Sequence, residues 1–298
     1  MNTGKRPPAP TATPVRDRIA AIAAEDRFTS GGLAHRVLSF GPPTGRDLVY
    51  VPGITTNAEA VHFIAAALPE FRFHVPDLRG RGGSDAAGPG RYTLGHYRDD
   101  LAALIAHLGV RAPVVVGHSL GARIVAAWAV DHPDAATEAT VVLVDPPTSG
   151  PGRAPYPITR AAFLAQIDAA RRGVTAEELR AHYPKWPPRE LELRTELLGS
   201  CDRTAVSETH RGFEEEDFFP LWDRLSGDVT LVHGADSPMV PPSAVAELAR
   251  RNPAVRLARV DGAAHMIPWE NLPGFTAALR AATAAPAGAS TSGTTEES

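Results

Sequence analysis

Short apolar runs recur along the chain and end in turn residues. The clearest are DLVYVPG (47–53), FRFHVPD (71–77), PVVVGHS (113–119), VVLVDPP (141–147) and VTLVHGAD (229–236). Runs of this length, rich in Val and Leu, are typical of strands that are buried on both faces of a parallel sheet. We therefore predict that these segments, followed by VRLARV (255–260), are strands of one central sheet.

Helical patterns fill the gaps between these runs. Apolar residues recur at three- and four-residue steps from Leu94 to Leu108, which gives one apolar stripe along a helix. Further helices are expected after Ser119, over Ser243 to Arg251 and around Pro273 to Ala282. This alternation predicts an α/β fold with a doubly wound, mostly parallel sheet, whose functional groups gather at the carboxyl ends of its strands.

Composition divides the chain into a core, an insertion and two tails. The alternating pattern covers residues 17–147 and 223–280, and we expect these two segments to form the core. Residues 148–222 instead contain Pro-rich turns and amphipathic pieces such as RELELRTELLGS, which predict a helical lid inserted over the site. Residues 1–16 and 281–298 are rich in Pro, Thr, Ala and Ser, and we expect disordered tails there.

The overall composition excludes several kinds of partner. The chain is 43% hydrophobic and 21% charged, and its net charge of -4 offers no basic surface for nucleic acid. No apolar run reaches the ~18 residues of a membrane span, and the first residues lack an apolar stretch of signal-peptide length. Cys201 is alone, which excludes an internal disulfide and favours a reducing compartment. We expect a cytoplasmic protein without a nucleic-acid or membrane partner.

The segment PVVVGHSLGARI carries the strongest chemical signal. A strand runs through Gly117-His118-Ser119-Leu120-Gly121 directly into a helix, which matches the G-x-S-x-G nucleophile elbow. Such a turn exposes the serine hydroxyl, and its glycines avoid clashes between closely spaced backbones. The helix start also offers free N–H groups where an oxyanion would form. We predict that Ser119 is a nucleophile.

A serine nucleophile needs a histidine base within hydrogen-bonding reach. His265 follows the last strand-like run and precedes the terminal helix, so the order along the chain is serine, acid, histidine. His118 lies inside the turn itself and is expected to point away from Ser119. We therefore predict that His265 is the base.

Two aspartates could orient His265. Asp236 follows the strand VTLVHGAD, and Asp145 ends the strand VVLVD. Both are expected near His265, and spacing alone does not separate them. We favour Asp236, because the strand before the last helical crossover is the usual position of the acid after such a serine turn.

Other residues are candidates for binding. The segment VPGITTN places the backbone N–H of Ile54 as a partner for that of Leu120 in an oxyanion hole. The candidate substrate contacts are Arg123, Arg153, Tyr156 and Arg160. Arg79 and Arg81 could clamp an anionic substrate, but we favour a role in holding loops. Trp186 and Trp222 are expected to pack in the core or lid. The sequence contains no H-E-x-x-H, no Cys pair and no phosphate-binding glycine loop after a strand, so we predict an enzyme without metal or cofactor.

Through VPG, DLRGRGGSD, GHSLG, LVDPP, GADSPMVPP and AAHMIPW, the chain resembles the α/β-hydrolase superfamily over nearly its whole length between the tails. Within it, VLVDPPTSGPGRAPYP and AAHMIPWENLPGF are similar to the N-formylmaleamate deformylases of bacterial nicotinate breakdown. That resemblance implies a C–N acyl hydrolase for a small anion. It also implies that the acid lies at Asp145, against the preference for Asp236.

Three functional classes fit these observations. We favour a serine hydrolase that cleaves a small ester or amide substrate through a Ser-His-Asp triad and an acyl-enzyme. The alternatives are carbon–carbon cleavage or cofactor-free haloperoxidase chemistry on the same fold, and a non-catalytic ligand receptor. The sequence leaves the oligomeric state open, a homodimer included.

Overall fold

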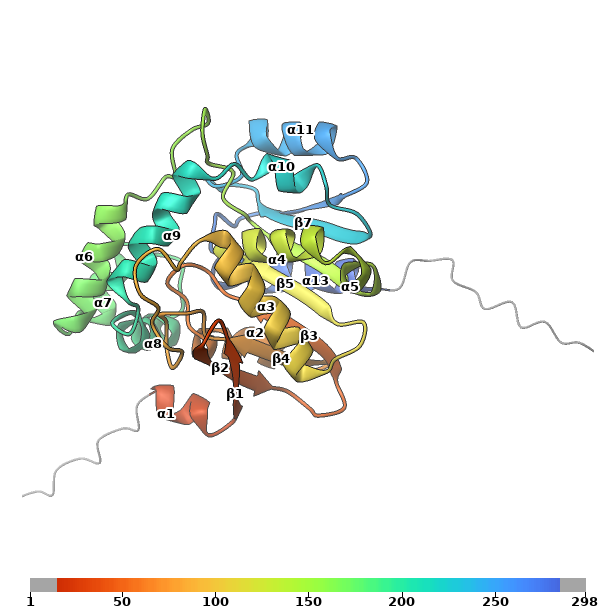
Figure 1. Ribbon diagram of the computed structural model, residues 1–298. Helices are drawn as coiled ribbons and strands as arrows, with labels where there is room; N and C mark the ends of the chain where they lie inside the picture. Colours follow the sequence, from red (N-terminus) through yellow and green to blue (C-terminus); the bar gives the residue numbers. More distant parts are fainter. Residues whose placement is uncertain (1–14, 285–298) are drawn as a thin grey trace, which may run out of the picture.

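The computed structural model describes residues 15–284, which are built around one eight-stranded sheet (Figure 1). Its strand order is β1-β2-β4-β3-β5-β6-β7-β8. β2 runs antiparallel to both neighbours, and all other neighbouring strands are parallel. The strands are β1 Ala24–Ser30, β2 Leu33–Phe40, β3 Arg46–Val51, β4 Phe71–Pro76, β5 Val114–His118, β6 Thr140–Val144, β7 Asp228–Gly234 and β8 Arg256–Val260. The predicted doubly wound, mostly parallel sheet is confirmed.

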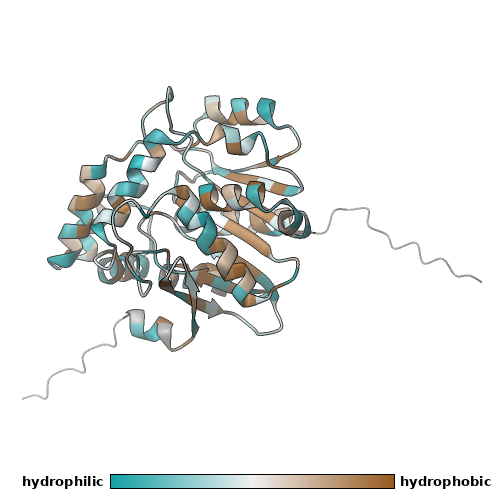
Figure 2. Cartoon of the chain, in the orientation of Figure 1, coloured by the Kyte–Doolittle hydropathy of each residue, from teal (hydrophilic) through white to brown (hydrophobic). Residues whose placement is uncertain are grey.

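Each central strand contributes side chains to two separate apolar clusters, one on each face of the sheet. In β5, Val114 and Val116 pack in one cluster, and Val115 between them packs in the other. All three valines are fully buried. Figure 2 shows these central strands among the most hydrophobic parts of the chain. Burial on both faces explains why the sequence shows continuous apolar runs here.

Helices cover both faces of the sheet and complete the two clusters. Those that pack with Val115 are α3 Leu94–Leu108, α4 Leu120–Asp131, α5 Pro133–Glu138, α10 Phe219–Trp222 and α11 Pro242–Arg251. Those that pack with Val114 and Val116 are α1 Val15–Ala20, the 3₁₀ helix Ala58–Val61, α2 His62–Ala67, α12 Ile267–Glu270 and α13 Leu272–Thr283. The helices expected at 94–108, after Ser119, at 243–251 and at 273–282 are therefore present.

The first two strands were not predicted. β1 and β2 form an antiparallel hairpin at one edge of the sheet, and most of β1 is exposed. Its sequence AEDRFTS has only one large apolar residue, Phe28. Charged residues are common on edge strands because they discourage pairing with another chain. The hairpin therefore lacks the apolar run on which the other strand predictions depend.

Residues 148–222 contain the predicted helical pieces. Four of the helices lie beside one another beyond one end of the sheet (Figure 1). They are α6 Arg160–Arg171, α7 Ala176–Arg180, α8 Pro188–Leu198 and α9 Arg203–Glu215. The Trp186 ring before α8 stacks on Trp269 of the core at 5.1 Å. Whether this segment opens and closes as a lid stays a prediction.

Both predicted tails are a few residues too long. α1 begins at Val15, whose side chain is buried, and α13 continues to Thr283. These short stretches are ordered because their apolar residues, including Val15 and Ala282, complete one of the core clusters. The remaining tail residues, 1–14 and 285–298, lie outside the described residues. Within 15–284, no helix is both long and apolar enough to cross a bilayer.

Candidate active site

Ser119 lies in a sharp turn between β5 and α4. Its φ of 57° and ψ of −116° form a conformation that side-chain-bearing residues rarely adopt. A β-carbon on Gly117 would lie 2.2 Å from the Gly121 carbonyl oxygen, and one on Gly121 would lie 1.9 Å from the Val51 carbonyl oxygen. The close approach of three backbone segments therefore requires both glycines of the motif.

Three predicted residues form a continuous set of side-chain contacts. Oγ of Ser119 lies 3.0 Å from Nε2 of His265, and Nδ1 of the same ring lies 2.7 Å from Oδ2 of Asp145. A carboxylate can only accept hydrogen bonds, so Nδ1 carries the ring proton and Nε2 can accept the proton of the serine hydroxyl. Asp145 is fully buried, whereas 13% of the His265 side chain is exposed.

The Asp145 carboxylate is held by backbone and side-chain donors. Its Oδ1 accepts from the N–H of Gly234 at 3.1 Å, and its Oδ2 also accepts from the hydroxyl of Ser237 at 2.5 Å. Asp145 has a φ of 50°, in the left-handed region that Asp tolerates better than most residues. These contacts fix the direction in which the carboxylate faces His265.

The preference for Asp236 is contradicted by the structure. Asp236 follows β7 at the expected edge of the sheet, but its side chain is exposed. Its backbone N–H donates to the Ala263 carbonyl at 3.0 Å, while the hydrogen bond to His265 comes from Asp145. Asp145 and Asp236 follow the neighbouring parallel strands β6 and β7, so both lie at the same edge of the sheet. The direction of each side chain therefore decides which aspartate contacts His265.

The predicted oxyanion donors lie at the start of α4 and on the loop after β3, both beside Ser119. Leu120 is the first residue of α4, so its N–H has no acceptor within the helix. Ile54 lies in the loop after β3, where a β-carbon on Gly53 would come within 3.4 Å of Cβ of Ser119. Nε of Arg81 donates to the Ile54 carbonyl at 3.0 Å, which holds the peptide group that follows the predicted donor. Arg81 is therefore structural, as predicted.

His118 packs beside His265 without taking part in the contact to Ser119. The two rings are 5.1 Å apart, and Nε2 of His118 lies 3.0 Å from the His265 backbone carbonyl. Burial, followed by repulsion from His265, lowers the pKa of His118 to about 3. The ring is therefore neutral, donates through Nε2 and holds the loop that carries His265.

A cavity of about 210 Å³ lies beside Ser119 and His265. The predicted substrate contact Tyr156 lines it, and its ring stacks on Phe213 at 4.7 Å. Burial raises the pKa of the Tyr156 hydroxyl above its usual value, although an interaction with Ser119 partly opposes this shift. Tyr156 is therefore a neutral hydroxyl next to Ser119.

Arg194 of α8 lines the same cavity, although no sequence pattern had indicated it. Its guanidinium is buried and donates to the Thr55 carbonyl at 2.7 Å, the Thr55 hydroxyl at 2.9 Å and the Tyr183 hydroxyl at 3.2 Å. Within residues 15–284, Arg194 has no hydrogen bond to a carboxylate, and its Nε atom has no hydrogen-bond partner. Arg194 therefore offers a buried positive charge to an anion in the cavity.

Arg123 does not reach this cavity, contrary to prediction. Its Nη2 donates to the carbonyls of Ser149 at 3.0 Å and Glu216 at 2.8 Å. Its guanidinium also lies 5.6 Å from the centre of the Phe213 ring. Burial lowers the pKa of Arg123 to about 10. The residue connects the segment after β6 to the end of α9 and has a structural role.

Arg153 and Arg160 also lie outside the cavity beside Ser119. Arg153 pairs with Glu247 at 3.1 Å and with Asp217 at 3.1 Å, and its guanidinium lies over the Phe219 ring. Two carboxylates already neutralise its charge, so it is not available to a substrate anion. Arg160 is exposed at the start of α6.

The remaining predicted structural residues are buried in packed surroundings. Arg79 forms a two-point contact with Asp100, in which Nε and Nη2 both lie 2.7 Å from its oxygens. Trp222 is fully buried and donates to the Leu248 carbonyl at 2.9 Å. Cys201 is also fully buried. No cluster of three or more His, Cys, Asp or Glu within 15–284 could hold a metal ion.

Comparison with known proteins assigns this chain to one family. Residues 48–272 match the family described as alpha/beta hydrolase fold. An N-formylmaleamate deformylase of Pseudomonas putida is 33% identical over 262 residues, which cover 88% of this chain and 97% of that protein. A 2-(acetamidomethylene)succinate hydrolase of Mesorhizobium japonicum is 30% identical, over 84% of this chain and 93% of that protein.

A solved structure agrees with these relatives. The crystal structure of the N-formylmaleamic acid deformylase from Pseudomonas putida S16 superimposes with a TM-score of 0.79 at 36% identity. The superposition covers 86% of this chain and all of that one. The similarity therefore extends over the sheet, the insertion and the loops that carry the site.

Proposed function

This chain belongs to the α/β-hydrolase family, and from that premise we propose that it cleaves a small amide that carries a carboxylate group. The observation that carries the proposal is the set of contacts from Asp145 through His265 to Ser119, beside a cavity that also holds the Arg194 guanidinium. The contacts supply an activated nucleophile, and the guanidinium supplies a cation for the substrate.

The proposed reaction proceeds through an acyl-enzyme on Ser119. The hydroxyl oxygen attacks the amide carbon while Nε2 of His265 takes its proton, and Asp145 stabilises the resulting imidazolium. The N–H groups of Leu120 and Ile54 stabilise the negative oxygen of the tetrahedral intermediate. His265 then protonates the departing nitrogen. A water molecule, deprotonated by the same ring, releases the acid and restores the free serine.

The names of two relatives support the proposed substrate class. One hydrolyses N-formylmaleamate and the other 2-(acetamidomethylene)succinate, so both act on a short acyl group attached to nitrogen in a compound with carboxylates. In this chain, Arg194 would hold such a carboxylate through charge-assisted hydrogen bonds. The acyl carbon would then face Ser119.

An activity screen tests this proposal. N-formylmaleamate, an acetamido dicarboxylate and the methyl ester of each would be compared as substrates. We expect kcat/KM to be about tenfold or more higher for the free carboxylates, because a hydrogen bond to a charged group is stronger than one to a neutral group. Ser119→Ala is the matched control.

Covalent labelling gives an independent measure of the nucleophile. A fluorophosphonate should add once to the native protein and not to Ser119→Ala, as followed by intact mass. A protein that neither turns over an ester or amide nor takes up the label would contradict the proposal, and stable binding of an intact ligand would then favour a receptor. A higher kcat/KM for the methyl esters would refute only the proposal that the substrate carries a carboxylate.

A further inference from the structure

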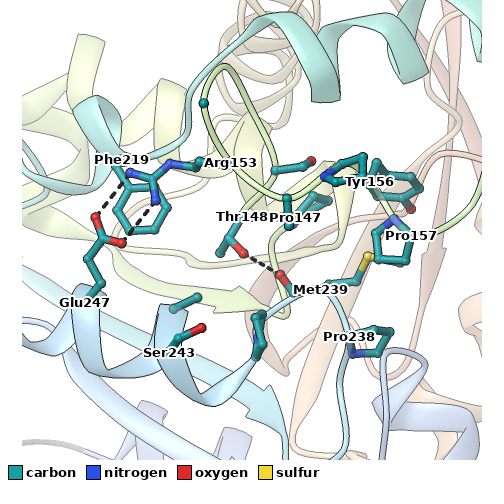
Figure 3. Close-up of a pocket in the computed structure, with 16 residues that line it drawn as sticks. Pro147, Thr148, Arg153, Tyr156, Pro157, Phe219, Pro238, Met239, Ser243 and Glu247 are labelled. Carbon is teal, nitrogen blue, oxygen red and sulfur yellow. Dashed lines mark hydrogen bonds and ion pairs between the residues drawn. The ribbon is translucent and has the colours of Figure 1, made fainter.

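A second cavity, of about 220 Å³, lies beside the cavity that is lined by Ser119 and His265. We call the latter the active cavity. Tyr156, Pro157, Pro238 and Met239 line both cavities, so these four residues form the wall between them. Figure 3 shows the second cavity, with the Met239 side chain extending toward Pro157 and Tyr156 close by. A change in one of these side chains can therefore alter both cavities.

Met239 is the part of this wall that can change shape. Its backbone is fixed, because its carbonyl accepts from the Thr148 hydroxyl at 2.6 Å and its N–H donates to the Ser237 hydroxyl at 3.1 Å. Its side chain is 3% exposed and unbranched, and such thioethers adapt readily to their surroundings. Tyr156 is instead held by stacking on Phe213, and the two prolines are rigid.

The second cavity suits an uncharged chain. Its cation, Arg153, is paired with Glu247 on the far side from Met239 (Figure 3). The rest of the lining combines apolar residues, among them Pro147, Pro241 and Ala244, with the uncharged hydroxyls of Thr148, Ser149 and Ser243. A charged group placed there would lose water and would meet no unpaired opposite charge in this lining, whereas an alkyl chain would gain by burial.

We propose that Met239 separates the second cavity from Ser119 and thereby restricts the enzyme to short acyl groups, and that the second cavity accepts a longer acyl chain once this side chain is shortened. This inference rests on the proposed function, in which Arg194 holds the substrate carboxylate. Arg194 does not line the second cavity but instead borders a small cavity that includes Thr55 and Thr56. Within the active cavity, the substrate carboxylate would therefore bind on the side of Arg194, and the acyl group would lie on the opposite side, against Met239.

The test compares chain-length preference in variants of this wall. For each variant, kcat/KM is measured with p-nitrophenyl hexanoate and p-nitrophenyl acetate, and their ratio is the readout. Met239→Ala should raise the ratio at least about tenfold, because a few added methylenes would become buried. Met239→Leu, which keeps the volume of the side chain, should leave the ratio close to the native value.

A variant at a second position tests whether a higher ratio in Met239→Ala comes from access to the second cavity or from a less ordered active site. Ala244 of α11 lines the second cavity and not the active cavity. Ala244→Phe should cancel the gain when combined with Met239→Ala, because the ring fills the space that the chain would enter. Alone it should not alter the ratio, because Met239 still closes the wall.

An unchanged ratio in Met239→Ala, with the acetate still hydrolysed, would overturn this inference and leave the assignment of Ser119 intact. If native protein hydrolyses neither ester, the proposed function is judged by the amide substrates and the covalent label described above, and the ratio cannot be measured. The cavity would then be tested by calorimetry, comparing hexanoate and acetate binding to Ser119→Ala with and without Met239→Ala. If Met239→Ala raises the affinity for hexanoate and not for acetate, the result would support the acyl-chain site. If it changes neither affinity, the result would refute it. Met239→Val serves if Met239→Ala does not fold.

Discussion

Asp145→Asn is expected to lower kcat by about 10⁴-fold with little change in KM, whereas Asp236→Asn should keep nearly native kcat. In the native protein, the Asp145 carboxylate accepts the hydrogen bond from Nδ1 of His265 at 2.7 Å. An amide at this position can present N–H to the ring, which then holds its proton on Nε2 and cannot accept one from Ser119. The Asp236 side chain is exposed and has no such contact.

Folding controls accompany this comparison because Asp145 is fully buried. Asn tolerates a positive φ as Asp does, and its oxygen can still accept from the Gly234 N–H, so the variant should fold. Thermal unfolding measured beside kcat separates loss of structure from loss of catalysis. A large loss in Asp236→Asn with a mild effect in Asp145→Asn would transfer the role to Asp236 and refute the geometry described above.

Arg194→Met is expected to raise KM for a carboxylate-bearing amide about 10- to 100-fold, which is the range for losing a hydrogen bond to a charged partner. For an uncharged ester such as p-nitrophenyl acetate, KM should change much less. Nη1 of Arg194 also holds the Thr55 carbonyl, next to the proposed oxyanion donor Ile54. Loss of this support would lower kcat for both substrates, so the ratio of the two KM values isolates the effect of the charge.

Two further variants complete the test of Arg194. Arg189 lies on the same helix and is exposed, so Arg189→Met removes a charge from α8 without reaching the cavity and should leave both KM values unchanged. Arg194→Lys keeps the charge but not the forked geometry, and should recover part of the affinity for the carboxylate. Equal rises in KM for charged and uncharged substrates in Arg194→Met would mean that Arg194 only supports the loop.

Tertiary structure changed the assignment of several cations that the sequence placed near the site. Arg123 was predicted as a substrate contact because it lies one turn into the helix after Ser119, and Arg153 because it lies in the predicted lid. Their partners are remote in sequence, however, and the pairing of Arg153 with Glu247 spans 94 residues. Arg194 showed no local signal, because RELELRTELL reads as an ordinary amphipathic helix. The contact with Thr55, which lies 139 residues earlier in the chain, is what buries the Arg194 guanidinium beside Ser119.

The sequence by itself determined the parallel sheet, the helices that cover it and the turn that places Ser119 beside the cavity. These features depend on interactions within about a dozen residues: two-sided burial needs apolar runs, and the crowded turn needs Gly117 and Gly121. His265 was also identifiable, because it follows the last strand. The choice between Asp145 and Asp236 required the tertiary structure. Both end neighbouring strands at one edge, and only the backbone turn at Asp145, with a φ of 50°, and its contacts from β7 direct a carboxylate to the imidazole.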